Sequence, residues 1–234
     1  MKYLEPPMKF DIGLMKFIPD LFKKKPLLTF DLDNTLLNSD KAHVVAYQYA
    51  LKKLNLKVLK DKEIYLQFGK PKQEVAKAIS NSNDKKIIKK ITKYHDYYLW
   101  NKSNSLSKVL PGVKETLEYL KKKYEIAVIS NCSHKSILKL LNGAGLNKKY
   151  FDFVIGDDDV NHPKPWPDEL FLAEKLAREN ALFHIGDSIY DIRAAKKAKV
   201  KAISILSGHY TKAQLQKEKP FKILKHIKLL KEIL

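Results

Sequence analysis

The sequence predicts an α/β protein in which a Rossmann-like, doubly wound parallel sheet carries an inserted all-helical domain. From residue 26 onward, short apolar runs alternate with segments that have the apolar spacing of amphipathic helices. The interval between the first two runs is too long for a single crossover and has helical spacing throughout. With 234 residues, 44% of them hydrophobic, the chain can bury the core that such a fold needs.

Five strands are expected from runs rich in apolar and β-branched residues, at 27–30, 125–130, 151–155, 181–185 and 202–206. The stretch 221–234 is typical of a last edge strand followed by a helix with Ile227, Leu230 and Ile233 packed inward. Helices are expected after Pro111 and at 136–141, 168–178 and 189–198, each forming a right-handed crossover.

The insert is expected to span residues 38–105 and to form a helical cap, with the core made of 26–37 and 106–234. Segments 42–54, 72–80 and 85–100 have helical apolar spacing, and the polar run 101–107 is predicted to be a hinge. The first 25 residues form an extension to which we assign no role, although 15–25 could form a short amphipathic helix.

The composition carries a formal net charge of +19, and this invites a nucleic-acid-binding interpretation. Only Arg178 and Arg193 among the 45 basic residues are arginine, however, whereas specific phosphate and base recognition favours the guanidinium group. The insert contains 15 Lys and 6 acidic residues, so it contributes +9 of the total. Because the lysines are spread over all helical segments, a solvated surface explains them best, and the pattern argues against a nucleic-acid partner.

The single Cys132 cannot form an intrachain disulfide, and no signal peptide or apolar stretch long enough for a membrane span is recognised. We therefore expect a cytoplasmic protein without a membrane partner, either a monomer or a homodimer.

Asp31 and Asp33 follow the first apolar run directly and are two residues apart. In an extended segment, residues i and i+2 point the same way, and open α/β sheets bind ligands at the carboxyl ends of their strands. Paired carboxylates can hold a divalent cation, or divide the work of nucleophile and proton carrier. A helix cap by Asn34 or Thr35 is the simpler structural alternative.

Three later segments also fall at strand ends. Ser130 and Asn131 close the second strand and could cradle an anion or cap a helix. Lys164 lies between two prolines that hold its loop stiff. Asp187 and Asp191 follow the fourth strand, where they could converge on one cation or serve the start of a helix.

These four clusters, in this order, resemble the motifs of the haloacid dehalogenase superfamily, specifically its phosphoglycolate phosphatase-like members with a helical cap between the first and second motifs. The resemblance spans about residues 26–234 and implies a phosphatase that hydrolyses a small phosphomonoester, such as phosphoglycolate or a sugar phosphate, through an aspartyl phosphate. It implies Asp31 as nucleophile, Asp33 as general acid and base, and Lys164 as a catalytic cation.

The resemblance further implies a Mg²⁺ ion held by the Asp31 carboxylate, the Asp33 backbone carbonyl, Asp187 and Asp191. Substrate contacts are implied for Ser130 and Asn131, and are also expected for Thr35 and for Lys70 in the cap loop. Asn34 stands where the family often has glycine, and the second acid Asp33 argues against the dehalogenase branch.

Other chemistry-bearing residues are expected to be structural. The run Asp157 to Asp159 precedes the Lys164 loop and is interpreted as linker. The seven histidines show no ligand spacing and are not expected to group with Cys132 as a transition-metal set, and His184 is expected in the core.

Two further hypotheses stay open. One is a phosphomutase on the same core, which would pass the phosphoryl group to another hydroxyl instead of to water. The other, from a different functional class, is a basic nucleic-acid-binding protein that keeps the fold.

Overall fold

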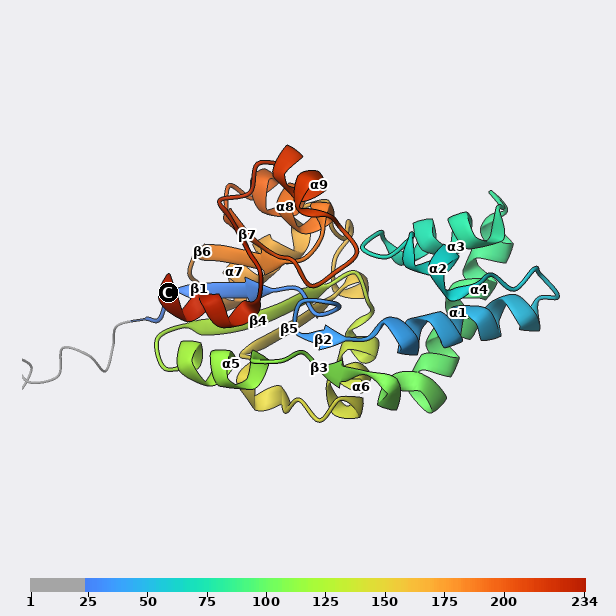
Figure 1. Cartoon of the computed structure of the whole chain (residues 1–234), viewed down its shortest axis with the longest axis horizontal. Coiled ribbons are helices and arrows are strands. Elements are labelled where there is room, and N and C mark those ends of the chain that lie inside the picture. The colour runs from blue at the N-terminus through green and yellow to red at the C-terminus, as the bar shows by residue number, and fades with distance from the viewer. Residues whose placement is uncertain (1–23) are drawn as a thin grey trace, which may run out of the picture.

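The computed structural model describes residues 24–234, and a sheet of six parallel strands runs through its centre (Figure 1). The strand order along the sheet is β5-β4-β1-β6-β7-β8. The strands are β1 (Leu27–Phe30), β4 (Glu125–Ser130), β5 (Phe153–Gly156), β6 (Ala181–Gly186), β7 (Lys201–Ile205) and β8 (Lys222–Leu224). Strand β1 lies inside the sheet, between β4 and β6. Its carboxyl end therefore lies near the middle of the edge at which the parallel strands end.

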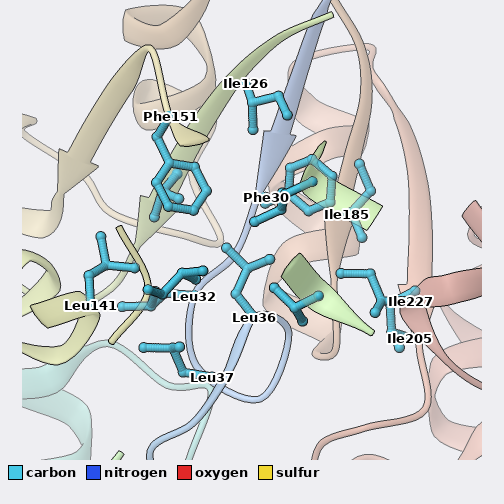
Figure 2. Close-up of a cluster of buried hydrophobic side chains, with 14 of the residues drawn as sticks. Phe30, Leu32, Leu36, Leu37, Ile126, Leu141, Phe151, Ile185, Ile205 and Ile227 are labelled. Atoms are coloured by element: carbon cyan, nitrogen blue, oxygen red, sulfur yellow. The ribbon is translucent and has the colours of Figure 1, made fainter. Parts of the chain in front are cut away.

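Both faces of the sheet are buried under helices. Leu28 and Phe30 of β1 pack into a cluster with residues of α5 and α6, part of which is seen in Figure 2. Leu27 packs on the opposite face, in a second cluster with residues of α7 and α8. This two-sided burial explains why the strands read as continuous apolar runs. It confirms the predicted doubly wound α/β fold.

The core helices are α5 (Val113–Lys121), α6 (His134–Gly143), α7 (Asp168–Ala177), α8 (Ile189–Lys197) and α9 (Lys212–Lys217). The short α9 was not predicted; Thr211 caps it by accepting a hydrogen bond from the Gln214 amide. Strand β5 starts at Phe153 instead of residue 151, because Lys148–Tyr150 forms a 3₁₀ turn capped by Asn147. The chain ends as predicted with edge strand β8 and a helical segment, Ile227–Glu232, which is 3₁₀ in geometry.

Helices α1 (Asp40–Lys53), α2 (Asp61–Tyr65), α3 (Lys72–Ser80) and α4 (Lys85–Tyr98) lie beside the carboxyl end of the sheet (Figure 1). They enclose a hydrophobic cluster of their own, with Leu51, Ile64 and Ile91 fully buried. Helix α1 also packs Ala42 and Ala46 into the cluster under the sheet. The two segments that connect helices α1–α4 to the rest of the chain pair with each other as a short antiparallel ribbon, β2 (Leu37–Asn38) with β3 (Lys108–Val109).

The prediction that residues 101–107 form an irregular hinge is wrong, because most of this run is helical. Residues Leu99–Ser103 form a π-helical turn that continues α4, and Asn104–Leu106 form a 3₁₀ turn. The polar side chains donate to backbone carbonyls: Asn101 to Tyr97 O at 2.7 Å and Ser103 to Ala42 O at 2.8 Å. Polar residues that satisfy the backbone in this way support a helical end instead of a loop.

The proposed extension at 1–25 lies outside the described residues, except for Lys24 and Lys25. The ammonium groups of these two donate to the carbonyls of Arg178 and Lys121. No helix within residues 24–234 combines the length and the apolar character required of a membrane span.

Candidate active site

Asp31 and Asp33 leave β1 on either side of a buried anchor. Leu32 between them is fully buried, together with Leu36, in the cluster of Figure 2. The Asp31 amide donates to Ile185 O at 2.8 Å, which extends the β1–β6 ladder by one residue. Since Leu32 points into the core, its two acidic neighbours point away from it and line a common pocket.

The turn after Asp33 depends on Asn34, which has φ +60°. Asparagine is among the few non-glycine residues that adopt this left-handed conformation readily, which explains how Asn34 replaces the family's glycine. Its side chain donates to Asp40 at 2.8 Å, at the beginning of α1.

Lys164 reaches under the carboxyl ends of the strands and bridges two acids. Its Nζ lies 2.7 Å from Asp31 Oδ1 and 2.7 Å from Asp191 Oδ1, and its side chain is buried. Burial opposes the charge of Lys164, but the two carboxylates hold its pKa well above the usual value. Burial also opposes ionisation of Asp191, yet Lys164 and His184 hold the pKa of that carboxyl well below its usual range.

The third acid of this group, Asp187, has no comparable cationic partner within residues 24–234. One oxygen each from Asp31, Asp187 and Asp191 lies within 4.8 Å of the others. Burial and the neighbouring acids raise the pKa of Asp187 well above its usual value, and burial raises the pKa of Asp31 to about 7. One lysine therefore leaves the three carboxylates short of positive charge, and a hard divalent cation with oxygen ligands fits this donor set.

Two glycines make room for these acids. A Cβ atom at Gly208, after β7, would overlap the carboxylate of Asp187, and one at Gly186 would overlap that of Asp191. Ser188 caps α8 and exchanges hydrogen bonds with Asp191, so the capping alternative and the grouping of the acids both hold here.

Asp33 faces a different environment from Asp31. Its carboxylate accepts hydrogen bonds from Ser39 and lies 3.2 Å from His43 Nε2, 3.3 Å from Cys132 Sγ and 3.4 Å from Ser130 Oγ. Burial disfavours its charge, but His43 and the other donors lower the pKa of Asp33 to about 2. The two acids of the first motif thus have pKa values displaced in opposite directions.

A chain of buried polar groups continues from Asp33 into helices α1 and α4. His43 Nδ1 lies 3.0 Å from His95 Nε2, and His95 Nδ1 lies 2.9 Å from Asp96 Oδ1, while Lys72 donates to the other oxygen of that carboxylate, Oδ2. Burial lowers the pKa of His95 to about 4, so it is neutral at physiological pH.

The prediction that no histidine groups with Cys132 is wrong. His43 Nε2 lies 3.8 Å from Cys132 Sγ, although the two residues are 89 positions apart in the chain. His43 near the start of helix α1 lies against Cys132 in the loop after β4, and sequence spacing carries no trace of such a contact. The prediction for His184 is confirmed: it is fully buried on β6, 2.9 Å from Thr29 and 3.1 Å from Asp191.

Of the four residues predicted to contact the substrate, three line the pocket and one does not. Ser130 and Asn131 line the pocket at the end of β4, and Lys70 lines it from the loop between α2 and α3. Thr35 is fully buried and donates to Asp187 at 3.5 Å, so it lies behind that acid and is not part of the pocket lining.

The pocket is closed by contacts that the sequence did not predict. Asn131 Nδ2 donates to Gly69 O in the loop between α2 and α3 at 3.2 Å, and His209 after β7 pairs with Asp40 at 2.9 Å. Phe68 packs edge-on against His209. No sequence signal marks these contacts, because each joins segments that are far apart in the chain.

Glu169, at the start of α7, was also missed. It is fully buried, and neither carboxyl oxygen has a hydrogen-bond partner among the described residues. Burial raises the pKa of Glu169 to about 8, and the nearby Lys164 only partly offsets this. A buried carboxyl without partners is held protonated at neutral pH.

The acidic run Asp157 to Asp159 is engaged elsewhere. Asp158 and Asp159 accept hydrogen bonds from the backbone and ring of His134 at 2.7 and 2.8 Å, and Asp157 lies 3.8 Å from Lys72.

Comparison with known proteins places the chain in a family. The family model described as haloacid dehalogenase-like hydrolase matches residues 28–205. A probable phosphatase, IndB, from Dickeya dadantii is 33% identical over 202 residues, which are 84% of this chain and 87% of the relative. A phosphoglycolate phosphatase from Pseudomonas fluorescens is 30% identical, over 87% of this chain and 78% of its own.

Among solved structures, a putative haloacid dehalogenase-like hydrolase from Bacteroides fragilis superposes with a TM-score of 0.82 at 26% identity, covering 88% of this chain and all of the other. The resemblance predicted from the four motifs is therefore confirmed, and this protein belongs to the haloacid dehalogenase-like hydrolases.

Proposed function

We propose that this protein is a Mg²⁺-dependent phosphatase that hydrolyses a small phosphomonoester through an aspartyl-phosphate intermediate. The observation that carries the proposal is the division between the two acids at the end of β1. Asp31 lies against Lys164 and two further acids, whereas Asp33 is held apart by His43 and Ser39. Two carboxylates in contrasting environments are suited to separate catalytic tasks.

The chemistry divides into two displacements. Asp31 attacks phosphorus, a bond forms between its carboxylate oxygen and phosphorus, and the bond to the leaving oxygen breaks as Asp33 gives that oxygen a proton. Asp33 then takes a proton from water, whose oxygen attacks phosphorus and releases inorganic phosphate from Asp31. Covalent catalysis replaces one difficult step with two easier ones.

The proton that Asp33 must deliver can be stored beside it. His43 Nε2 lies 3.2 Å from Asp33 Oδ1, within hydrogen-bond reach, so the pair can share one proton between nitrogen and oxygen. Ser39 orients the same carboxylate. These contacts support the assignment of Asp33 as the acid and base.

The other pocket residues supply positive charge and donors for the phosphoryl group. Ser130, the backbone N–H of Asn131 and Lys164 are proposed to bind the phosphoryl oxygens, whose charge spreads in the transition state. Asp31, Asp187, Asp191 and the Asp33 carbonyl would hold Mg²⁺, which when bound offsets the repulsion between an anionic nucleophile and an anionic substrate.

The substrate is proposed to be small because the pocket is lined by both the core and helices α1–α4, which we treat as a cap formed by residues 38–105. Lys70 lines the pocket and donates only to Gln67 among the described residues. It is available for a leaving group that carries a carboxylate, and the relative named phosphoglycolate phosphatase makes phosphoglycolate the first candidate.

The test is the release of inorganic phosphate from a panel of small phosphate esters, with Mg²⁺ or with EDTA. Release should require Mg²⁺ and fall by several orders of magnitude in Asp31→Asn, since only the charged carboxylate attacks. The matched control is Asp84→Asn, which makes the same change at the exposed N-cap of α4 and should keep full activity. Turnover by a folded Asp31→Asn protein would exclude the covalent mechanism, and isomerisation of a sugar phosphate without phosphate release would identify a mutase.

A further inference from the structure

We propose a second metal site in the pocket, separate from the carboxylate cluster, in which Asp33, His43 and Cys132 bind a thiophilic divalent cation of the Zn²⁺ class. These side chains come from the ends of β1 and β4 and from α1. Carboxylate, imidazole and thiolate are the ligand types that Zn²⁺ prefers, whereas Mg²⁺ is held by oxygen atoms alone.

The three side chains bring their donor atoms close enough together for one tetrahedral ion, since one donor atom from each lies within 4.8 Å of the others. Cys132 Sγ lies 3.3 Å from Asp33 Oδ2 and 3.8 Å from His43 Nε2, and His43 Nε2 lies 3.2 Å from Asp33 Oδ1. Bond lengths of about 2.0 to 2.3 Å with tetrahedral angles place zinc ligands about 3.3 to 3.6 Å apart. The donors therefore need only small movements to surround an ion.

His43 is also oriented as a metal ligand requires. His95 Nδ1 donates to Asp96, which leaves His95 Nε2 to accept a hydrogen bond from His43 Nδ1. That hydrogen bond turns His43 Nε2 toward Asp33 and Cys132. A zinc-binding histidine commonly donates its other N–H to a fixed partner in this way.

The site opens to the substrate pocket, because all three residues line it. A fourth position can therefore be filled by water or by a substrate oxygen, and an ion can enter from solvent. Binding displaces to the solvent the thiol proton of Cys132 and the proton that His43 and Asp33 share, so that the thiolate, the imidazole nitrogen and the carboxylate all become ligands.

Occupation of this site would inhibit the enzyme, a consequence that rests on the proposed function. The ion would engage the carboxylate of Asp33 and the Nε2 lone pair of His43, which the acid and base steps require. Mg²⁺ would keep its own carboxylate ligands, so inhibition should not be relieved by excess Mg²⁺.

The experiment uses Co²⁺ as a spectroscopic substitute for Zn²⁺, added to the full chain in the presence of excess Mg²⁺. Because Cys132 is the only cysteine, a thiolate-to-cobalt charge-transfer band can arise only there. We expect a band that saturates at one equivalent and disappears when Zn²⁺ is added. The absence of this band in the wild-type protein would overturn the proposal.

Three variants locate the site. Asp187→Asn, which alters the carboxylate cluster, should retain the band. His43→Gln should weaken Co²⁺ binding by at least about 100-fold, since a lost ligand costs more than the roughly 10- to 100-fold caused by a lost outer partner. An unchanged affinity in His43→Gln would reduce the site to a lone thiolate and overturn the proposal.

Cys132→Ser provides the second measurement should His43→Gln not fold. Its Zn²⁺ affinity, measured by competition with a coloured chelator, should fall by a similar factor, and an unchanged value would overturn the site. Zn²⁺ inhibition of phosphate release is measured in parallel. The cobalt band reads binding without substrate, so a failure of the proposed phosphatase activity is distinguishable from a failure of the site.

Discussion

The buried carboxyl of Glu169 makes the stability of this protein depend on pH in a way that one substitution should remove. Glu169→Gln keeps the size of the side chain and cannot ionise. The folded pKa of about 8 lies about 3.5 pH units above the ordinary 4.5. In the folded protein the proton stays on Glu169 throughout this interval, whereas the unfolded chain loses it above pH 4.5.

The sign follows from that difference. Between pH 4.5 and 8 the folded state binds the additional proton, so the free energy of unfolding of the wild type falls as the pH rises. At about 1.4 kcal/mol per pH unit, the total loss of unfolding free energy is limited to about 5 kcal/mol, and about 4 kcal/mol of it occurs between pH 4.5 and 8. The stability of Glu169→Gln relative to wild type should therefore increase by about 4 kcal/mol over this range.

The assay is urea denaturation of both proteins from pH 4.5 to 8 in EDTA, so that metal binding does not contribute. Taking the difference between the two proteins cancels the titration of groups that they share. Glu115→Gln, at an exposed position on α5, is the control for the loss of a surface carboxylate. A difference between Glu169→Gln and wild type that stays constant with pH would refute the reasoning, because it would show that Glu169 titrates alike in both states.

Three further predictions concern the pocket. In His43→Gln, the loss of the imidazole that lowers the pKa of Asp33 should move the basic limb of the kcat/KM profile to higher pH, since Asp33 must be protonated when the leaving group departs, and an unmoved limb would dissociate the two residues. Gly208→Ala adds a methyl group that overlaps Asp187 and should raise the Mg²⁺ concentration for half-maximal activity on the order of 10-fold, with the circular dichroism spectrum unchanged. Lys164→Met leaves two buried carboxylates without their cation and should cost about 3 to 5 kcal/mol of unfolding free energy in EDTA, with part restored by Mg²⁺. Equal stability of Lys164→Met and wild type in EDTA would contradict the buried ion pair.

Much of the core fold could be predicted from the sequence because local patterns express it directly. A strand covered on both faces must be apolar along its length, and a helix packed on one side must repeat its apolar residues with helical spacing. The strands at 27–30 and 125–130 therefore appeared at their observed bounds. The polar turn after α4 was misread because Ser103 satisfies a carbonyl of α1, which lies far away in sequence.

The candidate site was predictable to the extent that it follows from topology. Parallel strands end at one edge of a sheet, so residues after β1, β4 and β6 had to meet, and Asp31, Asp187 and Asp191 do so. Thr35 lies next to the same motif, but only its burial shows that it lies behind Asp187.

The sequence by itself determined the fold class, the family and the acids gathered at the strand ends, because hydrophobic periodicity and motif order are properties of neighbouring residues. Only the tertiary structure decided that His43 meets Cys132 over Asp33, that Glu169 is sealed without a partner, and that Gly208 makes room for Asp187. Each of these depends on segments that are distant in the chain, or on complete removal from water. Packing decides such contacts and the pKa values that follow from them, and no local pattern of residue types encodes them.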